Sequence, residues 1–176
     1  MNQITIEKAS LQDLSHLQQI GRQTFFETFS ASNSEENMRT YLDEGFSAEK
    51  LSAEVQDPNS AFYVARQGER VIGYLKLNTG PAQTELQDEQ ALEIERIYVL
   101  QEFHGQKVGQ MLYEEAMRVA TQMRAAYVWL GVWEENPRAI RFYQKNGFVE
   151  FDKHLFKLGD DEQTDILMKR PLTSPG

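Results

Sequence analysis

The chain has 176 residues, of which 40% are hydrophobic and 26% are charged, a composition ordinary for one globular domain with a substantial core. The absence of cysteine excludes disulfides, catalytic thiols and thiolate metal sites. A net charge of −9 argues against nucleic-acid binding, which needs a cationic surface, and suits a cationic ligand; acidity that merely keeps the protein in solution is an equal explanation.

The first half of the chain predicts a strand, three helices and a hairpin. No signal-peptide core and no long apolar run is present, so the cytoplasm is the expected compartment and no membrane contact is expected. A helix capped by Ser10 has its apolar residues on one side. The expected elements are a strand at Ile4–Lys8, helices over Ser34–Leu42 and Ser47–Val55, hairpin strands Ala61–Arg66 and Arg70–Asn78, and a polar loop over residues 79–90.

The central segment LEIERIYVLQEFHGQKVG predicts an anion site. An extended run over residues 92–99 leads into a turn with Gly105 and Gly109, and helical spacing of apolar residues follows, from Leu112 to Met123. Unpaired backbone N–H groups and the positive end of the helix dipole meet at such a turn. A phosphate-bearing ligand would bind there; a surface turn with a helix cap is the alternative, because neither GxGxxG nor GxxxxGK[ST] is present.

A second pattern, WLGVWEENPRAIRFYQKNGF, predicts a buried strand at Tyr127–Trp133 and a short helix. Asn136 is the expected N-cap, Pro137 the first helical residue, and Gly147 the C-terminal stop. A final hairpin is expected over residues 151–158 and 163–169, around a turn at residues 159–161. We expect one domain over residues 1–170 and a frayed tail over residues 171–176.

Taken together, HGQKVG and the NPRAIRFYQKNGF segment resemble the two signatures of the GNAT N-acetyltransferase superfamily. The resemblance extends to bacterial PaiA-type spermidine/spermine N-acetyltransferases through FFETFSASNSEENMRTYL, LEIERIYV and GDDEQTDILM. Two positions depart from the usual [QR]xxGx[GA] loop, since His104 replaces Gln or Arg and Lys107 replaces the first glycine. The resemblance implies an α/β GNAT fold, a twisted mixed sheet flanked by helices.

The resemblance also implies acetyl-CoA as the cosubstrate and no metal. Strand residues would meet the pantetheine arm and loop amides the pyrophosphate; for Lys107 and Asn136, a solvent-facing lysine and a simple helix cap are the alternatives. The expected cofactor residues are Ile97, Tyr98, Val99, His104, Gly105, Gln106, Lys107, Val108, Gly109, Gln110, Asn136, Tyr143 and Lys145. The three histidines are far apart and have no metal-ligand spacing.

Three acidic residues and one tyrosine are candidates for the chemistry. The resemblance makes Tyr143 the acid that protonates the CoA thiolate, with an aromatic anchor as the alternative. Strand alternation places Glu93 and Glu95 on one face, where either could act as base; a salt bridge to Arg96 is nearly as good an explanation. The resemblance makes Glu27 a candidate for the acceptor pocket, with a solvent-facing helical residue as the alternative.

The expected function is therefore transfer of an acetyl group from acetyl-CoA to a primary amine, most plausibly a polyamine, by direct attack. A different amine acceptor and a catalytically silent acyl-CoA-binding module are the alternatives. The polyamine rests on the resemblance and on the negative charge of the chain. A homodimer is left open by the sequence.

Overall fold

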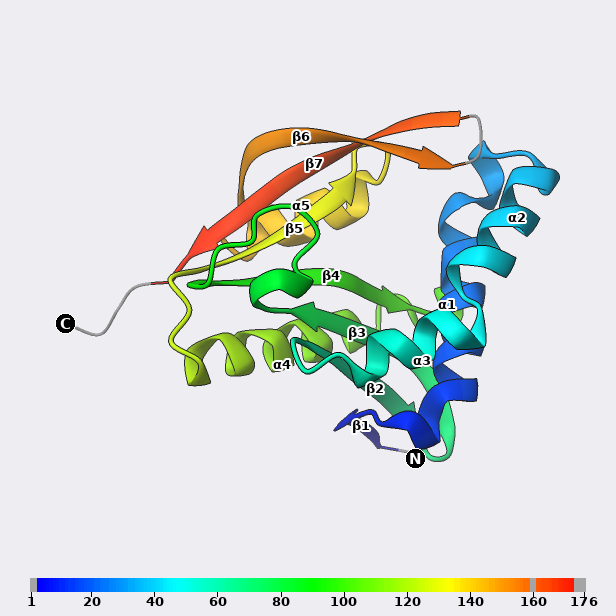
Figure 1. Cartoon of the computed structure of the whole chain (residues 1–176), viewed down its shortest axis with the longest axis horizontal. Helices are drawn as coiled ribbons and strands as arrows, with labels where there is room; N and C mark the ends of the chain where they lie inside the picture. Colours follow the sequence, from blue (N-terminus) through cyan, green and yellow to red (C-terminus); the bar gives the residue numbers. More distant parts are fainter. Residues whose placement is uncertain (1–2, 159–160, 173–176) are drawn as a thin grey trace.

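The computed structural model describes residues 3–158 and 161–172. In this part of the chain a seven-stranded sheet with the order β1-β2-β3-β4-β5-β7-β6 is flanked by helices, as the sequence predicts (Figure 1). The elements are β1 (Ile4–Lys8), α1 (Leu14–Phe29), α2 (Glu35–Gly45), α3 (Ala48–Gln56), β2 (Ser60–Gln67), β3 (Arg70–Asn78), β4 (Ala91–Val99), α4 (Val108–Gln122), β5 (Tyr127–Trp133), α5 (Pro137–Lys145), β6 (Val149–Leu158) and β7 (Asp161–Pro171).

The helices begin where the sequence places polar caps. Ser34, Ser47 and Asn136 each accept a hydrogen bond from a backbone N–H three residues later, which confirms them as N-caps of α2, α3 and α5. Ser10 forms a capping box with Asp13, but it caps a short 3₁₀ turn that precedes α1.

The helix expected to end at Leu42 instead continues to Gly45. The amide of Phe46 still donates to the Leu42 carbonyl (3.2 Å), and the Tyr41 ring packs over Gly45, so the last turn is closed by contacts that the local pattern does not show.

The sheet separates between the two strands that pair in parallel. All neighbouring strands are antiparallel except β4 and β5, and these pair only from Ala91–Tyr127 to Ile94–Leu130. Beyond Ile94 the strand β4 keeps its partner β3 but pairs no longer with β5. Because α4 makes the crossover between these two strands, its N-terminus lies near the carboxyl end of β4, where the opening is.

Helices cover both faces of the sheet. The helices α1 and α3 contact β3 and β2, while α4 packs under β3 and β4 on the opposite side (Figure 1). The α5 helix packs against α4, since the Phe142 ring lies edge-on to the Tyr113 ring with the two ring centroids 5.8 Å apart. Along α4 the predicted apolar face is confirmed, since Leu112, Ala116 and Ala120 are fully buried.

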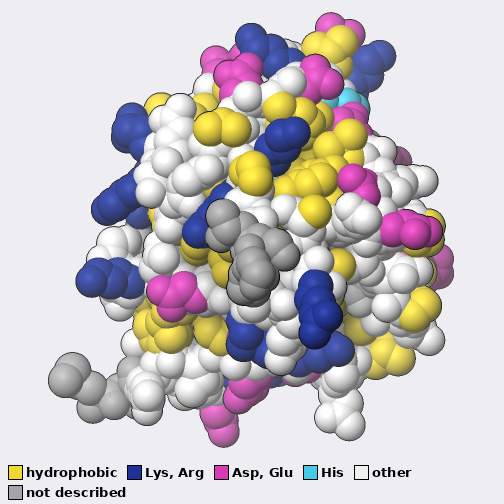
Figure 2. Space-filling model, turned by 90° about the vertical axis from the view of Figure 1, so that its left-hand side faces the viewer, with side chains coloured by type: hydrophobic (Ala, Val, Ile, Leu, Met, Phe, Trp, Pro, Cys, Tyr) yellow, Lys and Arg dark blue, Asp and Glu magenta, His cyan; other side chains and the backbone are white. Residues whose placement is uncertain are grey.

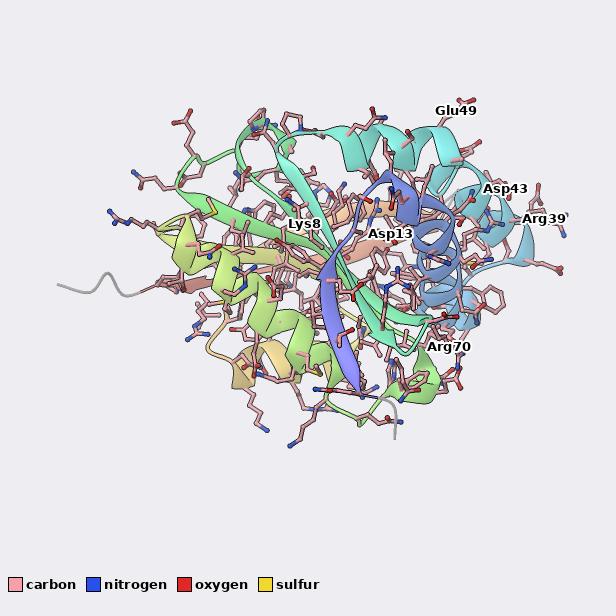
Figure 3. The ribbon with its side chains drawn as sticks, turned by 90° about the horizontal axis from the view of Figure 1, so that it is seen from below. Lys8, Asp13, Arg39, Asp43, Glu49 and Arg70 are labelled. Atoms are coloured by element: carbon pink, nitrogen blue, oxygen red, sulfur yellow. The ribbon has the colours of Figure 1, made fainter. Side chains whose placement is uncertain are left out.

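Charged side chains lie mainly at the periphery. Seen from below, Arg39, Asp43 and Glu49 point outward from α2 and α3 (Figure 3). On the side shown in Figure 2, lysines and arginines are mixed with acidic side chains.

Within the described residues, no helix combines the length and apolar character needed to cross a bilayer.

The C-terminal strand is longer than the sequence predicts. Pro171 still pairs with Tyr127, and the amide of Leu172 donates to the Ala126 carbonyl (2.9 Å) while its side chain packs against the core. The frayed tail expected from residue 171 is therefore wrong for these two residues. The rest of that tail, and the centre of the turn expected at residues 159–161, lie outside the described residues.

Candidate active site

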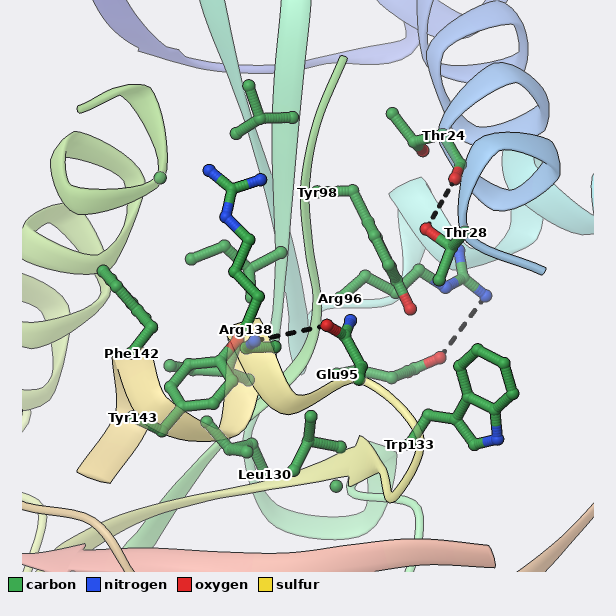
Figure 4. Close-up of a pocket in the computed structure, with 18 of the residues that line it drawn as sticks. Thr24, Thr28, Glu95, Arg96, Tyr98, Leu130, Trp133, Arg138, Phe142 and Tyr143 are labelled. Atoms are coloured by element: carbon green, nitrogen blue, oxygen red, sulfur yellow. Dashed lines mark hydrogen bonds and ion pairs between the residues drawn. The ribbon is translucent and has the colours of Figure 1, made fainter. Parts of the chain in front are cut away.

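A cleft of about 1100 Å³ lies at the opening between β4 and β5. Most of its lining comes from elements that are distant in sequence: α1, β4, the start of α4, β5, α5 and β7, with single residues from α2, β3 and β6. Figure 4 shows Tyr98, Glu95 and Arg96 from β4 opposite Phe142 and Tyr143 from α5, with Trp133 at the end of β5. The cleft brings together nearly all the residues that the sequence proposes for chemistry or cofactor binding.

The predicted anion site lies at one end of this cleft. Six of the seven loop residues expected there line it: His104, Gly105, Lys107, Val108, Gly109 and Gln110. Gln106 does not line it, and its backbone N–H donates to the Phe103 carbonyl (3.3 Å). Lys107 is the N-cap of α4 but its side chain makes no capping hydrogen bond. The first N–H groups of this 15-residue helix therefore have no partner from the cap and carry the positive end of its dipole into the cleft.

The surroundings of Gly109 indicate whether this end of the cleft has room for a ligand. A Cβ atom at Gly109 would have Val99 Cγ2, 4.0 Å away, as its only near neighbour, so packing within the described protein does not require glycine there. Glycine in a helix costs about 1 kcal/mol relative to alanine. A residue that weakens the helix, lacks a packing reason and lines the cleft is well explained by close approach of a ligand backbone or phosphate.

Lys107, which departs from the usual loop, adopts a left-handed conformation with φ 65° and ψ 18°. The left-handed region costs a non-glycine residue about 1–2 kcal/mol, and a lysine also opposes the positive end of the helix dipole. The chain thus retains the glycine-like backbone of the loop without the glycine.

We expect Lys107→Gly to be more stable than Lys107→Ala by about 1 kcal/mol, because both variants lose the charge and only glycine relieves the backbone strain. Chemical denaturation of the two variants measures this difference directly. Equal free energies of unfolding would contradict the strained conformation.

His104 and Arg138 form a polar pair at the mouth of the cleft. His104 Nε2 lies 3.0 Å from the Val99 carbonyl oxygen, which can only accept, so this nitrogen carries the proton. The other ring nitrogen, Nδ1, then accepts a hydrogen bond from the Arg138 guanidinium. Arg138 extends from α5 into the cleft (Figure 4), so His104 orients a cation beside the start of α4.

Arg138 is not among the residues expected from the sequence. The sequence did contain an indication of its role, because Arg138 lies in the first turn of the helix that Asn136 caps. A side chain at that position can reach the same space as the cap. Asn136, Phe142 and Lys145 also line this end of the cleft.

Tyr143 is a buried phenol in the cleft wall. Only 6% of the residue is exposed, and its ring lies edge-on to Phe142 and Phe148. Burial, with a smaller contribution from Tyr113, raises the pKa of Tyr143 well above its ordinary value. The hydroxyl is therefore protonated at neutral and mildly alkaline pH, as a proton donor must be.

Glu93 and Glu95 do point to one side, as strand alternation predicts. The Asn78 amide donates to Glu93 Oε1 (3.0 Å) and to Glu95 Oε1 (2.8 Å), and both residues line the cleft. Glu93 is 2% exposed and also accepts from the amide (2.9 Å) and hydroxyl (2.6 Å) of Thr84. Burial outweighs these hydrogen bonds and raises the pKa of Glu93.

Glu95 belongs to an ion-pair network instead. It contacts Lys76 (2.7 Å) and Arg96 (3.3 Å, Figure 4), and Glu54 of α3 also contacts both cations. A β-bulge at Glu95 lets it share a side of the sheet with Arg96, so the salt bridge considered from the sequence is confirmed. Burial opposes ionisation of Glu95, but Arg96 and Lys76 outweigh it and lower its pKa.

The remaining expected residues also lie on the cleft. Ile97, Tyr98 and Val99 pair with β3 along one edge of β4, and β5 leaves the other edge unpaired. Glu27 accepts from the Gln101 amide (2.9 Å) and from Gln23 (3.1 Å), which ties α1 to the turn before the loop. In the described part of the chain, no three His, Cys, Asp or Glu residues are grouped to hold a metal ion.

Comparison with known proteins agrees with this geometry. The model of the family described as "Acetyltransferase (GNAT) family" matches residues 21–148. The chain is 40% identical over 98% of its length to an uncharacterized N-acetyltransferase of Lactobacillus delbrueckii subsp. lactis, covering 99% of that protein. It is 27% identical to a spermidine N(1)-acetyltransferase of Thermoplasma acidophilum, covering 97% of this chain and 99% of that one.

A solved structure shows the same fold. The crystal structure of a PaiA N-acetyltransferase from Thermoplasma acidophilum in complex with coenzyme A superposes with a TM-score of 0.79 and 26% identity, covering 97% of this chain and 99% of that one. The fold expected from the two motifs is confirmed. On the family match over most of its length and the 40% identity to a named N-acetyltransferase, this chain belongs to the Acetyltransferase (GNAT) family.

Proposed function

We propose that this N-acetyltransferase transfers the acetyl group of acetyl-CoA to a primary amine of a polyamine such as spermidine or spermine. One observation carries the proposal: a single cleft is lined at one end by the N-terminus of α4 and elsewhere by carboxylates, with the protonated Tyr143 in its wall. The first feature suits a pyrophosphate, the second a cationic acceptor, and the third a leaving group that needs a proton.

The residues of the α4 end fit coenzyme A. The amides of Val108, Gly109 and Gln110 would hold the pyrophosphate, and Gly109 leaves the space that a phosphate needs. The cations Lys107, Arg138 and Lys145 line this end of the cleft, and so does Asn136. Ile97, Tyr98 and Val99 would present the unpaired edge of β4 to the pantetheine arm.

Acetyl-CoA, when bound, supplies an activated acetyl group as a thioester. The acceptor must first lose a proton, because an alkylammonium with a pKa of about 10.4 has no lone pair. Glu93 is the better base of the two central glutamates, since its pKa is raised while that of Glu95 is lowered; we propose that it takes the proton through water. The neutral amine would then attack the thioester carbonyl, so that a C–N bond forms and the C–S bond breaks. Tyr143 would donate its phenolic proton to the departing sulfur, and the proton that the attacking nitrogen loses would restore the phenol through water.

A polyamine acceptor has two supports. The 27% identical relative from Thermoplasma acidophilum is named a spermidine N(1)-acetyltransferase. The cleft itself is lined by six carboxylates, Glu27, Glu85, Glu93, Glu95, Glu135 and Asp165. Glu95 is compensated by Lys76 and Arg96, so the others matter more to an incoming cation.

We expect spermidine and spermine to be acetylated with a higher kcat/KM than monoamines or aminoglycosides. Each additional charge contact of about 1 kcal/mol multiplies affinity roughly fivefold. The preference should weaken as salt is raised, because exposed charges are screened over about 10 Å at 0.1 M. An acetyl-CoA turnover assay over an amine panel at low and high salt measures both effects.

Each result of the panel has a distinct meaning. A preference for a neutral-bodied monoamine, or a polyamine preference that ignores salt, would contradict the acceptor while leaving the acetyltransferase intact. Coenzyme A binding without turnover of any amine would favour a catalytically silent module.

A further inference from the structure

One corner of the cleft contributes carboxylates to the scheme above but has no specific contact assigned to it. It is formed by Gly131 of β5, Asp165 of β7, His154 of β6 and Glu85 of the loop between β3 and β4, all of which line the cleft. The register of β5 with β7 and of β6 with β7 places Asp165 opposite Trp133 on one side and His154 on the other. The corner is thus built by strands that the central glutamates do not belong to.

Gly131 keeps the floor of this corner open. It is an exposed glycine in the middle of a paired strand, where a glycine weakens the sheet and often marks close approach of another group. A Cβ atom at this position would lie 3.3 Å from Leu167 and 3.6 Å from Asp165 Oδ2. Any larger residue would therefore occupy the space directly beside the Asp165 carboxylate.

The charges of the corner do not balance. His154 Nδ1 pairs with Glu85, and their side chains are 46% and 30% exposed. Among the described residues, no ion pair within 4 Å joins Asp165 to a cation, since His154 is paired with Glu85. Burial, aided by Glu85 and opposed by His154, raises the pKa of Asp165. The corner thus holds two carboxylates and one imidazole, and the imidazole pairs with Glu85.

We propose that Asp165, together with Glu85, binds the second ammonium group of a diamine or polyamine acceptor while its first nitrogen is acetylated. This inference rests on the proposed function, and it assigns the preference for polyamines over monoamines to these two carboxylates. A carboxylate beside a hollow floor favours a compact ammonium, and the adjacent Trp133 offers an apolar face to the methylene chain of the acceptor. Monoamines cannot use this subsite.

The test compares two acceptors that differ only in the second nitrogen, diaminobutane and butylamine. In Asp165→Asn the ratio of their kcat/KM values should fall roughly tenfold, the loss of one charge-assisted contact. The kcat/KM for butylamine should fall much less than that for diaminobutane, because butylamine has no second ammonium, and the KM for acetyl-CoA should change little. Calorimetry of the two amines without acetyl-CoA measures the same difference in binding, independently of turnover.

Three further variants sharpen the result. Asp165→Glu should recover part of the diamine preference, and Gly131→Ala should reduce it by filling the floor. Glu162→Gln removes an exposed carboxylate of the same strand outside the cleft and should change nothing. Thermal unfolding of each variant checks that it is folded.

The outcomes separate this subsite from the proposed function. A wild-type preference for diaminobutane that persists in Asp165→Asn would overturn the subsite and leave the polyamine acceptor in place. An equal loss for both amines would make Asp165 part of the fold or the chemistry, which also overturns it. Equal use and equal binding of both amines by the wild type would overturn the subsite together with the polyamine acceptor.

Discussion

Replacing Tyr143 by phenylalanine should lower kcat by roughly tenfold to a thousandfold while the KM for acetyl-CoA changes little. The ring is held between Phe142 and Phe148 and only the hydroxyl is removed, so the packing should survive. A loss in kcat without a loss in cofactor binding is the behaviour of a group that acts only in the transition state. Steady-state kinetics with acetyl-CoA and a saturating amine measures it.

The pH dependence has a definite sign. Burial raises the pKa of Tyr143, so the phenol keeps its proton through the alkaline range in which the acceptor amine loses its own. The wild-type rate should therefore rise with pH and should not fall near pH 10, the ordinary pKa of tyrosine, because of this group.

Tyr113→Phe is the matched control. It also removes one buried phenolic hydroxyl, which accepts from Arg170 (2.6 Å), but this residue does not line the cleft. Its kcat should stay near that of the wild type even if the variant is less stable. A Tyr143→Phe enzyme with unchanged kcat, at pH values where a free thiolate leaves poorly, would reduce Tyr143 to an aromatic anchor of α5.

Local patterns predicted most of the fold. The strand Tyr127–Trp133 and the helix after Asn136 are where the sequence places them, because a β-branched run and an Asn-Pro cap act within a few residues. The orientation of Glu93 and Glu95 followed from the two-residue period of a strand, and both share Asn78.

Contacts between segments that are distant in the chain could not be predicted from the sequence. The bulge that puts Arg96 beside Glu95 depends on the pairing of β4 with β3, and the Arg138–His104 pair joins α5 to the loop before α4. Asp165 had a local signal, an acidic residue in the alternating strand β7, but its neighbour Gly131 comes from another strand. Likewise, Leu172 is held by Ala126, which no tail pattern could indicate.

Gly109→Glu should abolish acetyl-CoA binding, with an increase in KM or Kd of roughly a hundredfold or more, because it places a bulky anion where the pyrophosphate would lie. The protein itself should remain folded. A Cβ atom at this position meets only Val99 Cγ2 at 4.0 Å, and a glutamate in the first turn interacts favourably with the helix dipole. Loss of binding with unchanged unfolding would thus be an effect on the ligand site.

Gly109→Ala separates the two contributions of that residue. Alanine should stabilise the free protein by up to about 1 kcal/mol, since it favours the helix and has room. It should still weaken coenzyme A, because the methyl group occupies the space that the ligand would use. The thermal shift produced by saturating coenzyme A reports binding, as a ligand at a hundred times its Kd stabilises the native state by about 2.7 kcal/mol. A Gly109→Glu protein that keeps the wild-type shift would place the pyrophosphate away from α4, and the strain at Lys107 would then need another explanation.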